Sequence, residues 1–221
     1  RRLSREWSLP FRCLRVKSAK KRASQEGKSL QDWARQIRYS FFQRLSEREG
    51  AWGVAVAHHR EDQAETILAR LLRGAAARGL SGLRPLQSLG LKPGLPALRV
   101  WRPLLPYTKD QIQGYLLSRG IAWREDRSNR RTQYRRNQIR HEVLPFLSKW
   151  NPNLREVLAR LGEISSAEDE LLEGLLSAYG RKLKSRWGDH AYACDARRFQ
   201  AMPLALQRRW VRRVSEKLNG E

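Results

Sequence analysis

Apolar residues recur at helical spacing in the first quarter of the chain. From Ser29 onward they fall every three or four positions, which is the period of a helix that buries one face. Ser29 and Asp32 have the spacing of an N-terminal capping box, and Gly50 follows the last apolar position. The pattern predicts a helix between Ser29 and Gly50, with a buried stripe of Leu30, Trp33, Ala34, Ile37, Phe41 and Leu45.

A strand and a second helix are predicted next. Residues 52–57 form a short apolar run without charge, which is typical of a strand buried on both faces of a parallel sheet. Residues 61–73 then return to helical spacing. Their expected buried stripe is Ala64, Ile67, Leu68, Leu71 and Leu72. Helix, strand and helix in this order indicate an α/β fold.

The second half of the chain changes character part-way along. Residues 97–101 indicate another strand, and a helix is predicted from Thr108 to Gly120, with Thr108 and Gln111 at capping-box spacing. Beyond Tyr134 long charged helices are expected, with a turn at residues 151–153. We therefore predict an α/β domain at 1–148 and a smaller, mainly helical domain at 149–221.

The charge balance points to a polyanionic partner. Lys and Arg number 45 against 22 Asp and Glu, a net charge of +23. Such an excess attracts nucleic acid by counterion release, although an arginine-rich proteome would also raise the count. Clustering favours the nucleic-acid interpretation. The clustered arginines are Arg119, Arg124, Arg127, Arg130, Arg131, Arg135, Arg136 and Arg140.

Several other classes of protein fit the sequence poorly. No apolar run reaches the roughly 18 residues of a membrane span, and the chain opens with no secretory leader. A cytoplasmic location is expected. Cys13 and Cys194 stand in no metal-ligand spacing, so we expect buried free thiols and no metal site.

The start of the second helix carries the main candidate chemistry. Asp62 and Glu65 are three positions apart, so both carboxylates lie on one helix face, where they could hold an ammonium group or a metal ion. Acidic residues also favour first turns through the helix dipole alone. His58 and His59 could ligate a metal, but HExxH spacing is absent. Arg38 could bind a carboxylate or phosphate bidentately, or be a surface cation.

The loop at residues 73–82 is a weaker candidate. It holds three glycines and two arginines, beginning with Arg73 and Gly74, and this composition permits close backbone approach to an anion. It matches neither a Walker P-loop nor GxGxxG.

Taken together, these segments resemble the tRNA(Ile)-lysidine synthetase family. The resemblance covers roughly residues 30–147, and it depends on an ordered series of short strings rather than on one motif. The strings are Ala34 to Tyr39, His58 to Thr66, Arg73-Gly74, Gly79 to Gly82, Arg102 to Leu105, Glu125-Asp126, Ser128-Asn129, Tyr134 to Asn137, Ile139-Arg140 and Leu144-Pro145.

The resemblance implies an N-type ATP pyrophosphatase fold, with an adenine-nucleotide-hydrolase-like (Rossmann-like) parallel sheet and a helical tRNA-contacting domain after it. In this family, ATP and Mg²⁺ are used to adenylate C2 of the wobble cytidine of isoleucine tRNA, and free lysine then displaces AMP to give lysidine. By analogy Asp62 and Glu65 hold the lysine ammonium, while Arg38 and Arg136 face the lysine carboxylate or the nucleotide. The implied nucleotide contacts are His58, Arg73, Gly74 and Arg136. The expected tRNA contacts are Arg127, Asn129, Arg130, Arg131, Arg135, Asn137 and Arg140.

The sequence also departs from that family. The phosphate-binding string SGGxDS does not occur, so we expect an incomplete sheet and a fragment or a gene product that lacks its start. Two alternatives stay open, namely a non-catalytic RNA-binding module and a related tRNA-thiolating enzyme. The latter relies on paired cysteines, which this chain lacks. A homodimer is also left open.

Overall fold

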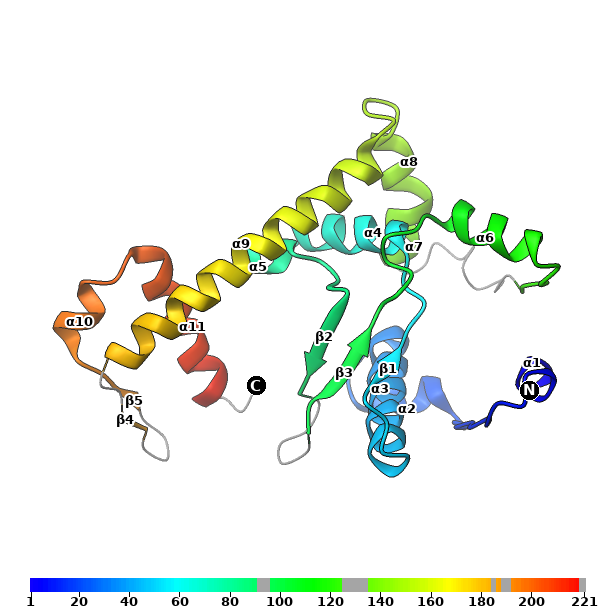
Figure 1. Cartoon of the computed structure of the whole chain (residues 1–221). Helices are drawn as coiled ribbons and strands as arrows, with labels where there is room; N and C mark the ends of the chain where they lie inside the picture. Colours follow the sequence, from blue (N-terminus) through cyan, green and yellow to red (C-terminus); the bar gives the residue numbers. More distant parts are fainter. Residues whose placement is uncertain (91–95, 125–134, 184–185, 188–191, 219–221) are drawn as a thin grey trace. The chain divides into compact units, whose positions relative to one another are not determined.

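The computed structural model describes residues 1–90, 96–124, 135–183, 186–187 and 192–218. The chain forms two compact units (Figure 1). The first contains Arg1–Ala55 and Leu86–Trp101, and the second contains Val56–Pro85 and Arg102–Glu221. The domain boundary expected at residues 148–149 falls in a turn inside the second unit and stays a prediction.

The first unit holds a small sheet and three helices. The helices are α1 (Arg2–Glu6), α2 (Ala19–Gln25) and α3 (Leu30–Arg48). The strands are β1 (Val54–Ala55), β2 (Leu86–Leu89) and β3 (Leu98–Trp101), in the spatial order β1-β3-β2. The β1–β3 pair is parallel, which confirms the α/β prediction, whereas β2 is antiparallel to β3 and was not predicted.

Helix α3 begins as its capping residue predicts but buries a different face. The Ser29 hydroxyl accepts a hydrogen bond from the backbone N–H of Asp32. Trp33 is buried as expected, yet the other buried side chains are Tyr39 and Gln43. Gln43 donates from its amide to the carbonyl of Pro96 at 3.0 Å, which satisfies the polar group that burial removes from water.

The second unit is mainly helical. Its helices are α4 (Arg60–Leu71), α5 (Ala77–Leu80), α6 (Lys109–Ser118), α9 (Leu154–Lys182), α10 (Ala196–Gln200) and α11 (Leu204–Leu218). Between α6 and α9 lie α7 (Arg135–Gln138), a π-helical turn η2 (Ile139–Val143) and α8 (Leu144–Leu147). The short strands β4 (Arg186–Trp187) and β5 (Tyr192–Ala193) pair with each other.

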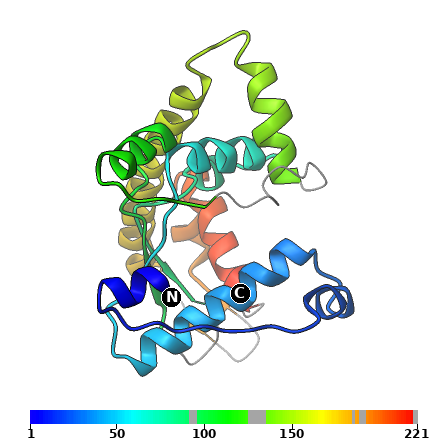
Figure 2. The ribbon, with the colours of Figure 1, turned by 90° about the vertical axis from the view of Figure 1, so that its right-hand side faces the viewer.

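The core of the second unit forms where α4 lies beside α9 (Figures 1 and 2). Its buried residues are Ala64, Ile67, Leu68, Ile139, Leu144 and Leu158. Gly162 of α9 permits the close approach, because a Cβ there would lie 2.5 Å from Cδ1 of Ile67. The predicted stripe of α4 is confirmed at Ala64, Ile67 and Leu68. It is wrong at Leu71 and Leu72, which are exposed where the helix ends.

A second apolar cluster forms at the far end of α9. It contains Leu176, Leu183, Met202 and Leu206, and Cys194 packs against it. Burial, with the charge of Asp195 added, raises the pKa of the Cys194 thiol. Cys13 is exposed, so the prediction that both thiols are buried is wrong.

The structure also bears on membrane insertion and on metal binding. No helix in the described part of the chain has the length and apolar character needed to cross a bilayer. Within the described ranges, no three His, Cys, Asp or Glu side chains gather closely enough to hold a metal ion.

Candidate active site

The first turn of α4 is held in place by polar contacts at both sides. The Asp62 carboxylate accepts a hydrogen bond from the backbone N–H of His59 at 3.0 Å, which satisfies a donor that the helix leaves free. The N–H of Arg60 donates to the carbonyl of Tyr107 at 2.9 Å. The position of the first turn, and of the acidic side chains on it, is therefore fixed by the backbone.

Asp62 and Glu65 are buried on the same face of α4. Their exposed fractions are 7% and 2%, which is rare for carboxylates unless they are paired. Both face the helical segment that begins with α7, and this segment supplies two arginines. The acidic residues are thus turned inward, not placed on a solvated helix end.

Arg136 and Arg140 bind this pair in different ways. Arg136 bridges the two carboxylates, donating from Nη2 to Asp62 Oδ1 at 2.7 Å and from Nε to Glu65 Oε2 at 3.1 Å. Arg140 donates to both carboxylate oxygens of Glu65, from Nε at 2.5 Å and from Nη2 at 3.0 Å. Its Nη2 also donates to Asp62 Oδ1 at 3.2 Å. We call these four residues the charge cluster.

The charge cluster is electrically balanced. Burial opposes the charge of Arg140, but its hydrogen bond and charge attraction to Glu65 outweigh that effect and raise the pKa of Arg140. Two guanidinium groups against two carboxylates leave no net negative charge for an added cation. A cationic ligand must therefore displace an arginine before it can bind the acidic pair.

His59 and Glu61 extend the polar network away from the arginines. His59 Nδ1 lies 2.7 Å from Glu61 Oε2, and His59 Nε2 lies 3.4 Å from Asp62 Oδ2. Glu61 also accepts hydrogen bonds from the backbone N–H of Lys109, the first residue of α6, at 3.0 and 3.2 Å. The predicted capping box of Thr108 and Gln111 places that N–H, and its two hydrogen bonds are present.

Comparison with known proteins identifies the family. The PP-loop domain matches residues 1–147, which is well over half of the chain. The chain belongs to the PP-loop family. This confirms the expected fold.

Several relatives of this PP-loop protein carry the same name. This chain is 36% identical to tRNA(Ile)-lysidine synthase of Geobacter sulfurreducens over 97% of this chain and 44% of that protein. The chain is 31% identical to tRNA(Ile)-lysidine synthase of Bacillus subtilis over 87% of this chain and 39% of that protein. The chain spans less than half the length of these curated relatives.

A solved structure supports the fold. The U34-tRNA thiolase NcsA from Methanococcus maripaludis, with its [4Fe-4S] cluster, superposes with a TM-score of 0.52. The alignment covers 73% of this chain and 53% of that one at 14% identity, so the likeness concerns the fold alone.

In this PP-loop protein, the other predicted site residues are scattered. Arg73 and Gly74 are exposed after α4, and Gly74 has a φ of +74°, a conformation that favours glycine. Asn137 is buried and Arg135 is exposed. Arg38 is exposed in the first unit. Arg127, Asn129, Arg130 and Arg131 lie outside the described residues.

Sequence reasoning missed Arg102, whose role is structural. Its side chain is almost fully buried, with 1% of the residue exposed, and Nη1 donates to the carbonyl of Arg84 at 2.7 Å. Its Nε lies 3.3 Å from Nδ1 of His58. The predicted nucleotide contact of His58 stays a prediction, since this nitrogen faces Arg102. An arginine directly after the end of β3, followed by Pro103, is the signal that could have indicated a buried guanidinium.

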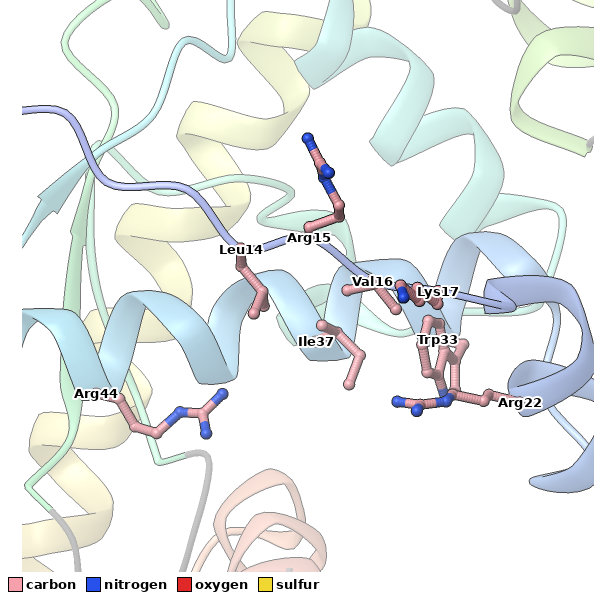
Figure 3. Close-up of a pocket in the computed structure, with 8 residues that line it drawn as sticks. All are labelled: Leu14, Arg15, Val16, Lys17, Arg22, Trp33, Ile37 and Arg44. Carbon is pink, nitrogen blue, oxygen red and sulfur yellow. The ribbon is translucent and has the colours of Figure 1, made fainter.

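An open groove in the first unit offers different chemistry. Its volume is about 440 Å³, and Figure 3 shows Leu14 and Val16 beside Trp33 and Ile37 of α3. The basic residues that line it are Arg15, Lys17, Arg22 and Arg44. Among the described lining residues there is no acid, so the groove suits an anion better than a cation. The charge cluster is the stronger candidate for catalysis because its groups are buried and oriented by several hydrogen bonds.

Proposed function

We propose that this chain supplies the lysine-binding and part of the tRNA-binding surface of a tRNA(Ile)-lysidine synthase. The reaction is ATP-dependent ligation of lysine to C2 of the wobble cytidine in isoleucine tRNA, through an adenylated intermediate. One observation carries the proposal: relatives with this activity in their name match nearly the whole chain, at 36% identity in the Geobacter sulfurreducens protein.

The charge cluster supports the assignment of lysine. An amino-acid substrate needs acidic groups for its ammonium and basic groups for its carboxylate, and the cluster contains both. The lysine ammonium would take the place of one guanidinium on Asp62 and Glu65. Arg136 is the better candidate to leave, because its side chain is 42% exposed against 29% for Arg140. Once released, Arg136 would be free to bind the lysine carboxylate or a phosphate.

The nucleotide part of the proposal has less support within this chain. PP-loop membership favours ATP as co-substrate, and His58, Arg73, Gly74 and Arg136 remain the proposed contacts. The string SGGxDS is absent from the 221 residues. The described residues also form no metal-ligand cluster, so they do not fit a protein-built Mg²⁺ site, and Mg²⁺ would be carried by the ATP phosphates.

The tRNA part depends on charge and on position. The net charge of +23 favours a polyanion, and the arginine-rich segment leads directly into α7 of the charge cluster. A tRNA bound to that segment would lie next to the proposed lysine site. Arg127, Asn129, Arg130, Arg131 and Arg135 remain the proposed contacts. Asn137 is buried and Arg140 is bound by Glu65, so these two residues would have to be released before they could contact tRNA.

A non-catalytic RNA-binding module is the second candidate, and the net charge of +23 would suit it equally well. A tRNA-thiolating activity has less support, because the relatives that match this chain are named tRNA(Ile)-lysidine synthase.

The deciding experiment is a lysine-transfer assay. A chimera would carry this chain in place of the aligned segment of the Geobacter sulfurreducens protein. It would be incubated with isoleucine tRNA, ATP, Mg²⁺ and radiolabelled lysine, and we expect label in the tRNA. A chimera that binds tRNA with the affinity of the parent protein but incorporates no label would favour the binding module.

A further inference from the structure

His59 stands between two carboxylates in a way that the lysine-binding role does not require. Its ring touches Glu61 on one side and faces Asp62 on the other, at 2.7 Å and 3.4 Å. The side chains of His59 and Glu61 are each 19% exposed, so the network reaches from a buried carboxylate toward solvent. A polar path through His59 and Glu61 thus connects Asp62 to the surface.

The contact with Glu61 selects one tautomer of His59 for the proposal. A carboxylate accepts, so the neutral tautomer that makes the 2.7 Å contact a hydrogen bond has its proton on Nδ1 and donates it to Glu61. In that tautomer Nε2 presents a lone pair to Asp62 Oδ2 at 3.4 Å. A proton delivered to Asp62 would lie between Asp62 Oδ2 and His59 Nε2 and would join these two atoms by a hydrogen bond.

The surroundings favour the transient charge that such a transfer creates. Protonated His59 would lie between the carboxylates of Glu61 and Asp62. Glu61 is held by the N-terminus of α6, whose first N–H donates to it. On the far side of Asp62, Arg136 and Arg140 bind only Oδ1, so Oδ2 remains directed at His59.

We propose that His59 is a positioning residue and proton acceptor for Asp62 in the lysine-transfer step, which rests on the proposed function. Lysine enters as an ammonium ion, and one proton passes to Asp62 and on to Nε2 of His59. The amine nitrogen then bonds to C2 of the adenylated cytidine, and the C2–O bond breaks. AMP leaves with the electron pair, and the second proton lost by the nitrogen goes to its phosphate.

The first test measures the tautomer in the chain itself. Imidazole ¹⁵N shifts, assigned with the His59→Gln variant, should show neutral His59 protonated at Nδ1. A neutral His59 protonated at Nε2 would overturn the proposal, because that nitrogen could then accept nothing from Asp62.

The second test separates the steps in the lysine-transferring chimera. In the His59→Gln variant, the rate of adenylation, measured as pyrophosphate release, should stay within about twofold of the parent rate. The rate of lysine transfer should fall by about 10²-fold, a typical contribution of positioned proton transfer. The variant must use amine that is already neutral. Its transfer rate should therefore rise about tenfold per pH unit between pH 7 and 9, because the ammonium pKa is about 10.4.

The outcomes distinguish this inference from the proposed function. The exposed His141→Gln provides the matched control and should keep the parent rates and pH profile. If His59→Gln lowers adenylation and transfer equally and keeps the parent pH profile, His59 is only structural and the inference fails. If the unsubstituted chimera adenylates tRNA but never transfers lysine, the proposed function itself fails.

Discussion

At the scale of single residues, the two arginines of the charge cluster differ in how strongly they bind Glu65. Glu65 is nearly fully buried and receives three hydrogen bonds, two of them from Arg140. Arg136 supplies the third and is the more exposed arginine. Arg140 is therefore the structural cation of the cluster, and Arg136 is the one that we propose a substrate replaces.

Removing these arginines should affect stability unequally. Arg140→Ala leaves Glu65 buried with one weaker partner, and we expect a decrease of about 3 kcal/mol in the free energy of unfolding. Arg136→Ala should cost about 1 kcal/mol, because Arg140 still neutralises Glu65. Urea unfolding followed by circular dichroism measures both, with the exposed Arg135→Ala as the control expected to change little. Equal decreases for the two variants would contradict the assignment of Arg140 as the structural cation.

The residue types of the site could be predicted, but their geometry could not. Asp62 and Glu65 are three positions apart on one helix, and Arg136 and Arg140 are four apart, so the spacing of each pair indicates a shared face. That the two faces meet depends on packing between segments more than 70 residues apart. No local pattern encodes such a meeting.

At the scale of elements, helix starts were predictable because capping is local. Ser29 and Thr108 were identified from their own neighbours, and each accepts a hydrogen bond from the backbone N–H three residues later. The reciprocal bond of a capping box is present at Thr108. The antiparallel strand β2 was missed, since Leu86 to Leu89 is short and lacks the β-branched residues typical of strands. Residues Leu86 to Leu89 form a strand because they pair with β3, and this pairing depends on the tertiary structure.

The packing of α4 against α9 depends on a glycine. Gly162→Ala would place a methyl group 2.5 Å from Ile67 and 2.7 Å from Gln63, so we expect a destabilisation of about 1–3 kcal/mol from overpacking. Gly174→Ala on the same helix meets no atom within 4 Å and should stabilise the chain by about 0.5–1 kcal/mol through helix propensity. Thermal unfolding of both variants tests this. A Gly162→Ala variant as stable as the unsubstituted chain would show that the two helices are not closely packed there.

At the scale of the whole molecule, the excess positive charge and its clustering along the sequence were visible, but the ion pairs that neutralise part of it were not. Arg84, Arg136, Arg140 and Arg209 are engaged by buried carboxylates, so they contribute less to an external field than their number suggests. We therefore expect the arginines at positions 119–135, before and at the start of α7, to contribute a larger share of the RNA binding than an even spread of the net charge would give them.

Substitution in that segment should change the salt dependence of tRNA binding. Replacing Arg130 and Arg131 with Gln should weaken binding and lower the slope of log affinity against log salt by about one unit for each phosphate group that the protein no longer neutralises. Filter binding over a salt series measures the slope. Replacing the exposed Arg1 and Arg2 removes the same charge and should change the slope less. Equal changes in the two variants would indicate a general charge effect and no localised binding site.

The most direct test of the account is the affinity of the lysine-transferring chimera for lysine compared with norleucine, which lacks the side-chain ammonium. Calorimetry should show lysine binding about 10-fold to 100-fold more tightly, as expected for a charged hydrogen bond, and Glu65→Gln should abolish this preference. If Glu65→Gln keeps the full preference for lysine, the charge cluster does not bind the ammonium, and the acidic pair serves only to stabilise the start of α4.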